Sequence, residues 1–235
     1  MLLRIRIQNF LSFQKETTFD MLTDPKIEGL PHHISKDTPL PLLKQAAIYG
    51  ANGAGKSNLI KTFVFLKNWV TNPKCLEEIE VCDYSFRMTD EDTKPPICLE
   101  VEFLSHQKAY LYKVAISEES IEESLYLSGL GKNTDTLIFE RKDSKLLIHS
   151  LLNESAINEL LTANKKTSLL VLHQGLGASY NPELKAAYEW FEQQLCIVKY
   201  PSDNLQLAKE LTSDEKLFDF VEDIIQSCDL DIDGI

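Results

Sequence analysis

The sequence has little of what defines several common protein classes. Its five cysteines are odd in number and scattered, with no C-x-x-C pair, which argues against a disulfide framework or a zinc knuckle. We therefore expect reduced, mostly buried thiols. No apolar run approaches the roughly 20 residues that span a bilayer, and Arg4 and Arg6 interrupt the N-terminus before a signal-peptide core could form. These absences predict a cytoplasmic protein with no membrane partner.

Basic residues are also scarce. Lysine and arginine number 24 against 36 aspartates and glutamates, so the formal net charge is −12. A chain whose main task is to coat nucleic acid is normally basic. Nucleic-acid binding through a local basic groove therefore stays possible, but the charge does not indicate it. We expect most acidic clusters, including Glu77–Glu80 and Glu118–Glu123, on solvated faces or loops.

What the sequence does contain is an eight-residue phosphate-binding pattern. Residues 50–57 read Gly-Ala-Asn-Gly-Ala-Gly-Lys-Ser and match G-x-x-x-x-G-K-[ST] at every position. The glycines let the backbone curl so that consecutive N–H groups face a phosphate. Lys56 is expected to reach the β- and γ-phosphates of ATP, and the Ser57 hydroxyl to ligate Mg²⁺. The expected nucleotide-binding residues are Asn52, Gly53, Ala54, Gly55, Lys56, Ser57 and Asn58.

The segments around this loop fit a strand before it and a helix after it. Gln45–Tyr49 is short and largely apolar, as in a buried parallel strand. Through Asn58–Val70 apolar residues recur at helical spacing, namely at Leu59, Ile60, Phe63, Leu66 and Val70. This context favours a nucleotide site over the alternative, a glycine-rich turn with a chance lysine.

The rest of the chain divides into a β-rich part and a helical part. Residues 2–8 alternate between apolar and polar, which predicts a half-buried strand, and a second strand is expected through Glu16–Met21. Thr23–Pro41 is expected to be a long loop. Alternation and turn residues between Val81 and His149 predict an antiparallel β-meander.

Beyond the meander the pattern becomes helical. A short helix is expected at Ser155–Ala163. Asn181 and Pro182 are expected to cap and begin a second helix, and a capping box at Thr212–Glu215 is expected to begin a third.

The order of these segments resembles a known group of ATPases. Residues 2–13, with Asn9-Phe10-Leu11-Ser12-Phe13, together with residues 32–34, 48–59 and 110–112, resemble the ATP-binding-cassette heads of the SMC, RecF and RecN group. They are closer still to bacterial AAA-family ATPases related to the OLD family, RloC and the Septu protein PtuA, often encoded beside nucleases or toxins in phage-defence loci. The resemblance implies an α/β P-loop NTPase, an ABC/SMC-type head with an antiparallel β subdomain and a following helical region.

The resemblance also implies an activity and partners. Such a head dimerises on ATP or forms a higher homo-oligomer, hydrolyses ATP and controls a partner effector, a nuclease or toxin, in antiphage defence. A DNA-repair or chromosome-organising SMC/RecF-like ATPase is one alternative, and a nucleotide-gated scaffold that needs no turnover is another.

Two further site assignments follow from the resemblance. Related heads carry a glutamine loop that contacts Mg²⁺ and the attacking water, and Leu169–Gly175 has the form of an apolar strand ending in Gln174. Gln174 is therefore a catalytic and metal-binding candidate beside Lys56, with an ordinary strand-to-loop exit as the alternative. In related heads the Asn9–Phe13 turn lies near the ribose and base. The alternative is that Phe10 and Phe13 simply fill the core.

Several parts of such a head are not found in the sequence. Leu127–Gly131 mimics a signature motif and Leu137–Glu140 follows it, but that strand continues Glu-Arg instead of Asp-Glu, so we expect a loop and a hairpin strand. Asp229–Gly234 matches only the first six positions of a calcium loop, and His32-His33 has no further ligand at a telling distance.

These residues are therefore expected to form the N-terminal part of a longer head whose C-terminal half is absent. Its regions would be a β lead-in, loop and first helix (1–70), the β-meander (75–150) and a helical region (151–235). On this view residues 1–235 alone bind ATP weakly and do not turn it over.

Overall fold

The computed structural model describes residues 1–24, 31–36, 38–88, 95–132, 134–148, 159, 161–174, 181–198, 209, 212–213 and 215–227. The chain divides into two compact units, Met1–Leu195 and Cys196–Ile235. The second unit contains α8 (Glu215–Ser227), the helix that the amphipathic pattern predicts there. Within the described ranges, no helix is both long enough and apolar enough to cross a membrane.

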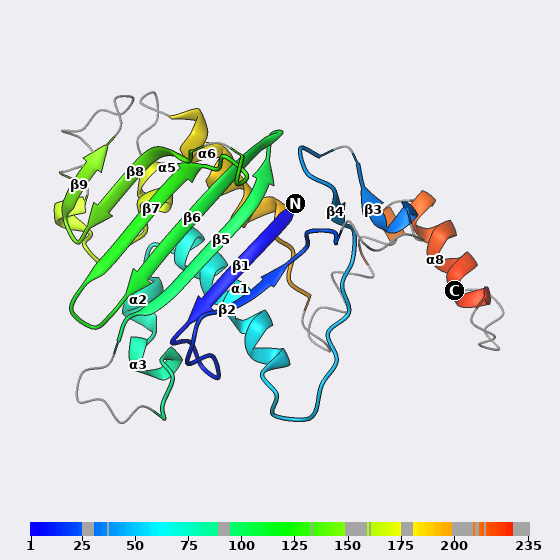
Figure 1. The fold of residues 1–235 in the computed structure, drawn as a ribbon, viewed down its shortest axis with the longest axis horizontal. Helices are drawn as coiled ribbons and strands as arrows, with labels where there is room; N and C mark the ends of the chain where they lie inside the picture. The colour runs from blue at the N-terminus through cyan, green and yellow to red at the C-terminus, as the bar shows by residue number, and fades with distance from the viewer. Residues whose placement is uncertain are drawn as a thin grey trace. The chain divides into compact units, whose positions relative to one another are not determined.

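An antiparallel sheet of seven strands dominates the first unit (Figure 1), in the order β2-β1-β5-β6-β7-β8-β9. The strands are β1 (Leu2–Gln8), β2 (Thr17–Asp20), β5 (Ile97–Ser105), β6 (Lys108–Ile116), β7 (Ile121–Leu127), β8 (Thr136–Lys142) and β9 (Lys145–Ile148). The predicted β-meander is confirmed. The lead-in strand β1 pairs with β5, however, so the two expected β regions form one sheet.

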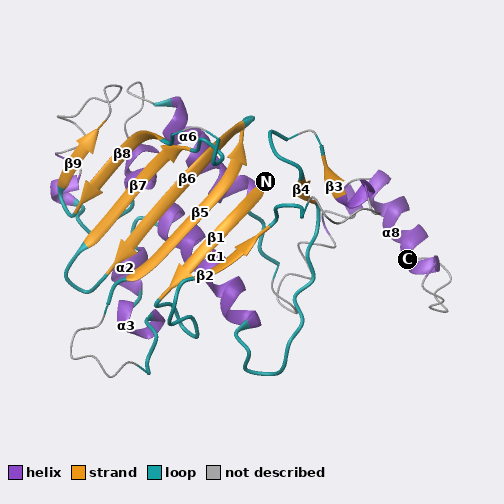
Figure 2. Cartoon of the chain, in the orientation of Figure 1, coloured by secondary structure: helices purple, strands orange, loops and turns teal. Residues whose placement is uncertain are grey.

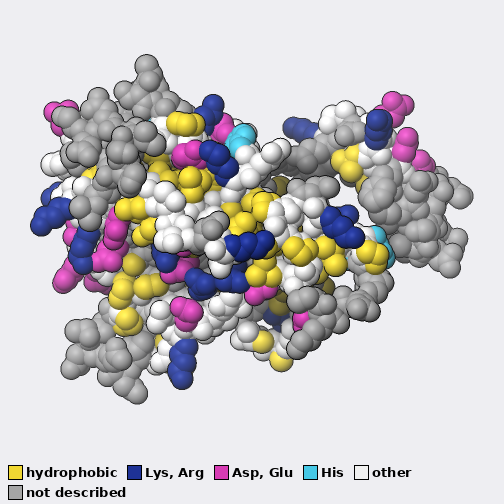
Figure 3. Space-filling model, turned by 45° about the horizontal axis from the view of Figure 1, so that its top comes forward, with side chains coloured by type: hydrophobic (Ala, Val, Ile, Leu, Met, Phe, Trp, Pro, Cys, Tyr) yellow, Lys and Arg dark blue, Asp and Glu magenta, His cyan; other side chains and the backbone are white. Residues whose placement is uncertain are grey.

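Alternating side chains explain why this sheet has one buried face. Leu99, Val101 and Phe103 of β5 are fully buried, whereas Glu100 and Glu102 between them point to the other face and are half-buried. Arg6 lies 2.7 Å from Glu100 on that open face. Figure 2 shows the helices of the first unit behind the sheet. Figure 3 shows basic and acidic side chains interspersed on the surface in view.

The helices of the first unit pack on the buried face. They are α1 (Lys56–Thr71), α2 (Cys75–Glu78), α3 (Val81–Tyr84), α5 (Leu169–Gln174), α6 (Pro182–Glu189) and a π-helical turn, η3 (Trp190–Gln194). The Asn181 side chain accepts hydrogen bonds from the backbone N–H groups of Glu183 (2.8 Å) and Leu184 (3.3 Å), which confirms the predicted cap of α6.

Lys67 of α1 forms hydrogen bonds to the last residues of the first unit. Lys67 Nζ donates hydrogen bonds to the carbonyl oxygens of Glu192 (3.1 Å) and Leu195 (2.7 Å), at the C-terminal end of η3. A cation at this end of a helical segment offsets the partial negative charge of its last carbonyls. The chain therefore leaves the first unit from a point fixed to α1.

Three local predictions are wrong. Val81–Tyr84 is a short helix rather than part of the β region. Leu169–Gln174 is a helix rather than a strand, because a short apolar run suits either state and the Ser168 hydroxyl accepts the Leu170 N–H at 3.2 Å, as at a helix N-terminus. The expected loop Thr23–Pro41 contains a 3₁₀ turn, η1 (Pro31–His33), and β3 (Ile34–Ser35), which pairs with β4 (Leu42–Leu43).

The thiol prediction is correct in part. Cys75, Cys82, Cys98 and Cys196 are free thiols, but only Cys75 is buried, and Cys196 is exposed. Burial raises the pKa of Cys75 to about 11, the nearby Glu78 charge adds to that rise, and a hydrogen bond from Asn68 opposes it. Most of the predicted helix Ser155–Ala163, and all of Asp229–Gly234, lie outside the described residues.

Candidate nucleotide-binding site

The predicted phosphate loop leads directly into α1. Gly55 is the N-terminal cap of this helix and has a left-handed backbone, with φ +91° and ψ +1°. Its carbonyl oxygen accepts the N–H groups of Asn58 (2.9 Å) and Leu59 (3.1 Å). Gly53 is also left-handed, with φ +82°. Because only glycine adopts such angles freely, the two residues give the loop the curl that the pattern predicts.

Lys56 spans the loop. Its Nζ donates to the carbonyl oxygens of Gly50 (2.7 Å) and Ala51 (2.8 Å), so the ammonium group lies across the start of the same loop. Ser57 is exposed at the second position of α1. The positive end of a helix, unpaired N–H groups and an ammonium group favour an anion at this place. The structure thus brings the predicted residues 52–58 together on one accessible loop.

The helix after the loop is amphipathic, with one correction. Leu59, Phe63, Leu66 and Val70 are buried as predicted, and Thr62, Phe65 and Trp69 complete the buried stripe. Ile60, which was placed on that stripe, is 45% exposed.

The predicted buried strand Gln45–Tyr49 is wrong. These residues are exposed and lie in no strand, and Tyr49 is 89% exposed and Ile48 43% exposed. A parallel strand is buried only where neighbouring strands and covering helices enclose it. All pairings of the described strands are antiparallel, and none of them includes this segment.

The N-terminal turn Asn9–Phe13 lies against the loop. The Ser12 hydroxyl accepts a hydrogen bond from the Asn58 side-chain amide at 2.9 Å. Phe10 is fully buried and its ring lies 5.4 Å from that of Phe65 in α1, while Phe13 is half-buried. Phe10 thus fills the core as the alternative interpretation expects, while the proximity of this turn to the ribose and base stays a prediction.

Gln174 lies on α5, not at the end of a strand. Its Nε2 donates to the Leu170 carbonyl oxygen at 3.3 Å. The approach to α5 is fixed near the C-terminal end of α1, where the Thr167 hydroxyl donates to the Pro73 carbonyl oxygen at 2.9 Å. The 16 residues of α1 put that end roughly 22 Å from the phosphate loop. The role assigned to Gln174 remains a prediction, and the expected strand that suggested it is absent.

The signature-like segment is a loop, as predicted. Leu130 (φ +54°) and Gly131 (φ +71°) turn the chain after β7, and Leu137–Glu140 lies within β8. Over the part of the chain that the structure describes, no group of three or more His, Cys, Asp or Glu residues is arranged to hold a metal ion.

A buried ion pair, which the sequence analysis missed, holds the far end of α1. Glu123 and Arg141 pair at 2.7 Å with both side chains fully buried. Glu123 also accepts hydrogen bonds from Tyr112 (2.6 Å) and Ser168 (2.7 Å), while Trp69 donates to Tyr112 at 2.7 Å. Burial, together with the Glu123 charge and hydrogen bond, raises the pKa of Tyr112 well above its ordinary value. The signal available in the sequence was the alternation along β7, which puts Glu123 on the same face as Ile121 and Leu125, whereas its partner Arg141 is given only by the strand pairing.

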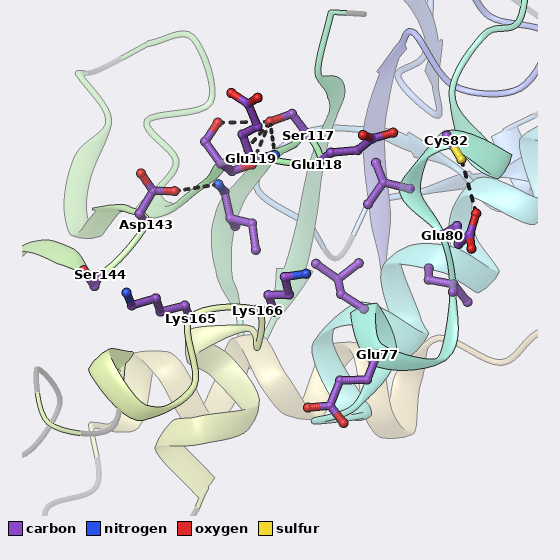
Figure 4. Close-up of a pocket in the computed structure, with 15 residues that line it drawn as sticks. Glu77, Glu80, Cys82, Ser117, Glu118, Glu119, Asp143, Ser144, Lys165 and Lys166 are labelled. Carbon is purple, nitrogen blue, oxygen red and sulfur yellow. Dashed lines mark hydrogen bonds between the residues drawn. The ribbon is translucent and has the colours of Figure 1, made fainter.

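A cleft of about 730 Å³ lies elsewhere, between α2, α3 and three turns (Figure 4). Glu77, Glu118 and Glu119 line it together with Lys165 and Lys166. This cleft shares no residue with the phosphate loop, and no glycine lines it. The chemistry of phosphate binding therefore points to the loop rather than to the cleft.

One family model matches the segment that contains this loop. Residues 46–151 match the model described as AAA domain, putative AbiEii toxin, Type IV TA system. This match supports a nucleotide-binding ATPase domain of the AAA, P-loop type. It begins just before Gly50 and covers α1 and strands β5 to β9. No curated protein sequence matches the chain.

Proposed function

We propose that the chain is the nucleotide-binding part of an ATPase head of the ABC/SMC or OLD type. The observation that carries this proposal is the loop itself. Two left-handed glycines and Lys56 lie at the N-terminus of a 16-residue helix, within the segment that matches an AAA domain. The large antiparallel sheet that packs on this helix supports the head-like architecture.

The residues present fit ATP with Mg²⁺. The N–H groups of residues 52–57 would hold the phosphates, Lys56 would exchange its two carbonyl partners for phosphate oxygens, and the Ser57 hydroxyl would ligate the metal. The left-handed φ of Gly55 favours glycine at this position, and a Cβ added there would lie 2.7 Å from Ser12 Oγ, which would have to move. Bound Mg²⁺ would neutralise charge that develops on the phosphate oxygens.

Exposed apolar side chains around the loop support a larger assembly. Ile48 and Tyr49 precede the loop, and Ile60 follows it in α1, and all three are exposed. We propose that further strands of a longer head cover Gln45–Tyr49, and that two heads pair when ATP is bound. Hydrolysis by residues 1–235 alone is then not expected, because the acid that positions water would come from outside them.

We also propose a partner. The matching family model carries the name of a toxin in a Type IV toxin–antitoxin system, which supports control of a toxin or nuclease effector in antiphage defence. A head that pairs on ATP can control such an effector only through contacts that differ between its paired and unpaired states.

Binding of a fluorescent ATP analogue in the presence of Mg²⁺ tests the proposed site. We expect the wild-type protein to bind and Lys56→Ala to bind at least about tenfold more weakly, because an ammonium–phosphate contact is lost. The matched control is Lys61→Ala, which removes an exposed lysine from the same helix and is expected to bind normally. Equal affinity for the wild type and Lys56→Ala would refute the proposed site.

A separate measurement tests turnover. Phosphate release from ATP by residues 1–235 should not exceed that of Lys56→Ala. Brisk release that depends on Lys56 would show that the catalytic acid lies within these residues, and the proposed division of the head would be wrong.

A further inference from the structure

We infer that Ser12 is a positioning residue of the phosphate loop, acting through Gly55 and Asn58. This inference rests on the proposed nucleotide site and concerns what keeps that site in shape. The contact joins two segments 46 positions apart in the sequence, so the loop pattern alone could not reveal it.

Hydrogen bonds to the segments that follow α3 and precede β5 hold the turn that carries Ser12. Asn9 is buried and left-handed, with φ +52°, and its side-chain oxygen accepts the Phe86 N–H at 3.3 Å while its amide donates to the Pro95 carbonyl oxygen. The backbone N–H of Leu11 donates to the Tyr84 carbonyl oxygen at 2.7 Å. The turn is thereby attached to α3 and to the start of β5.

The same turn is fixed to α1. The Phe10 ring packs between Phe65 of α1 (5.4 Å between centroids) and Tyr84 of α3 (5.8 Å). The backbones of Phe10 and Phe13 exchange two hydrogen bonds, of 3.0 and 2.8 Å, which close the turn. Ser12, at the tip of the turn, therefore reaches the loop from a base that packs against α1.

Ser12 contacts the phosphate loop at Gly55 and at Asn58. The Ser12 hydroxyl accepts the Asn58 amide at 2.9 Å. The Ser12 Oγ also lies 2.7 Å from the ideal position of a Cβ on residue 55, and Phe13 Cζ lies 3.8 Å from the same position. The Gly55 backbone is thus packed against Ser12 on one side, and it accepts the first hydrogen bonds of α1 on the other.

This arrangement gives Ser12 a definite effect. Without the hydroxyl, the Asn58 amide loses its acceptor and the Gly55 backbone loses a close contact, so the residues of the loop should be held less tightly. Because Ser12 is exposed, its replacement does not open a cavity in the core. The loop should therefore loosen without a general loss of stability.

Two measurements on Ser12→Ala test this inference. In the nucleotide-free protein, hydrogen–deuterium exchange of residues 50–58 should become faster, while exchange in β5 and β6 and the thermal unfolding midpoint stay unchanged. Affinity for the fluorescent ATP analogue should fall about three- to tenfold, the range expected for one lost hydrogen bond. The matched control is Thr17→Val, which removes an exposed hydroxyl that donates to the Lys15 carbonyl oxygen and should change neither quantity.

A double-mutant cycle separates positioning from direct contact with nucleotide. If Ser12 acts through Asn58, then exchange of residues 50–58 in the nucleotide-free protein should speed up by similar amounts in Ser12→Ala, Asn58→Ala and the double variant, because each breaks the same contact. Additive increases, or unchanged exchange of residues 50–58 in Ser12→Ala, would overturn the inference. The exchange measurement needs no ligand, so it decides the role of Ser12 even if the wild-type protein fails to bind ATP, an outcome that would count only against the proposed function.

Discussion

At the scale of single residues, the site depends on backbone angles that only glycine adopts easily. Gly55 combines a left-handed φ of +91° with a close neighbour, the Ser12 hydroxyl, which would have to turn away from any added side chain. Gly50, the first glycine of the pattern, has more space, since an added Cβ would meet the nearest atom at 3.5 Å, an ordinary contact. The two glycines of one motif therefore have different physical requirements.

This difference predicts the effect of alanine at each position. Gly55→Ala should lose nucleotide binding and lower the free energy of unfolding by about 1–2 kcal/mol, because alanine is strained at this left-handed φ and its Cβ would displace the Ser12 hydroxyl. Gly50→Ala should have the smaller effect on both. Thermal unfolding and ATP-analogue titration would measure the two variants, and a larger loss in Gly50→Ala would contradict the assignment.

A carboxylate on α6 predicts part of the pH dependence of stability. Partial burial alone would raise the pKa of Glu183, but hydrogen bonds from Lys108 and Tyr110 and the Lys108 charge outweigh it and lower that pKa below its ordinary 4.5. A lowered folded-state pKa stabilises the protein above pH 4.5, and this contribution is lost as the pH falls through the folded value.

Glu183→Gln should therefore flatten the loss of stability between about pH 5 and pH 3. Thermal unfolding midpoints at several pH values would measure this slope. Lys108→Met removes the main partner of Glu183 and should flatten the slope similarly. A Glu183→Gln slope equal to that of the wild type would show that this contact does not contribute.

At the scale of elements, α1 is held at both ends by different means. Its first turn contacts the Asn9–Phe13 turn through Asn58, and its middle contacts the same turn through Phe65. Near its end Trp69 joins a fully buried polar network centred on Glu123 and Arg141, whose guanidinium carbon lies 5.9 Å from the Trp69 ring centre. Arg141 also donates to the Thr167 carbonyl oxygen at 2.8 Å, so the network links α1, the sheet and the chain before α5.

Adjacent glutamates on β7 give a direct test of this network. Glu123→Gln leaves Arg141 charged and buried, so it should lower the free energy of unfolding by about 3–5 kcal/mol. Glu122→Gln removes the exposed partner of Lys142 and should change stability little. Chemical unfolding would measure both variants. Similar losses in the two would show that the buried pair contributes no more than a surface one.

The sequence predicted the elements whose signals are local. Alternation in β1 and β5 and the apolar stripe of α1 are properties of each segment alone, and the glycine pattern of the loop encodes its own curl. Short apolar runs were misassigned because their state depends on neighbours, as at Leu169–Gln174 and Gln45–Tyr49. Glu123 was expected on a solvated face because its burial depends on a partner 18 residues away, and the Ser12 contact depends on one 46 residues away.

At the scale of the whole molecule, the division after Leu195 separates the nucleotide site from the remaining residues. The loop, α1, the sheet and the buried network all lie within Met1–Leu195. We therefore expect a chain shortened to residues 1–195 to fold and to bind the ATP analogue with an affinity within about twofold of residues 1–235. Circular dichroism and titration would measure this. Loss of binding in a folded shortened chain would show that the second unit contributes to the site.

The attachment of Lys67 has a mechanical consequence. A force applied to the chain after Leu195 would reach the middle of α1 through the Lys67 ammonium group, and strand β5 through the Gln194 hydrogen bond to Ser105. The first turn of α1 contains Lys56, so the helix that Lys67 connects to the end of the first unit is the one that begins at the phosphate loop. A pull on residues beyond Leu195 would therefore load α1, which begins at the phosphate loop, together with strand β5 of the sheet.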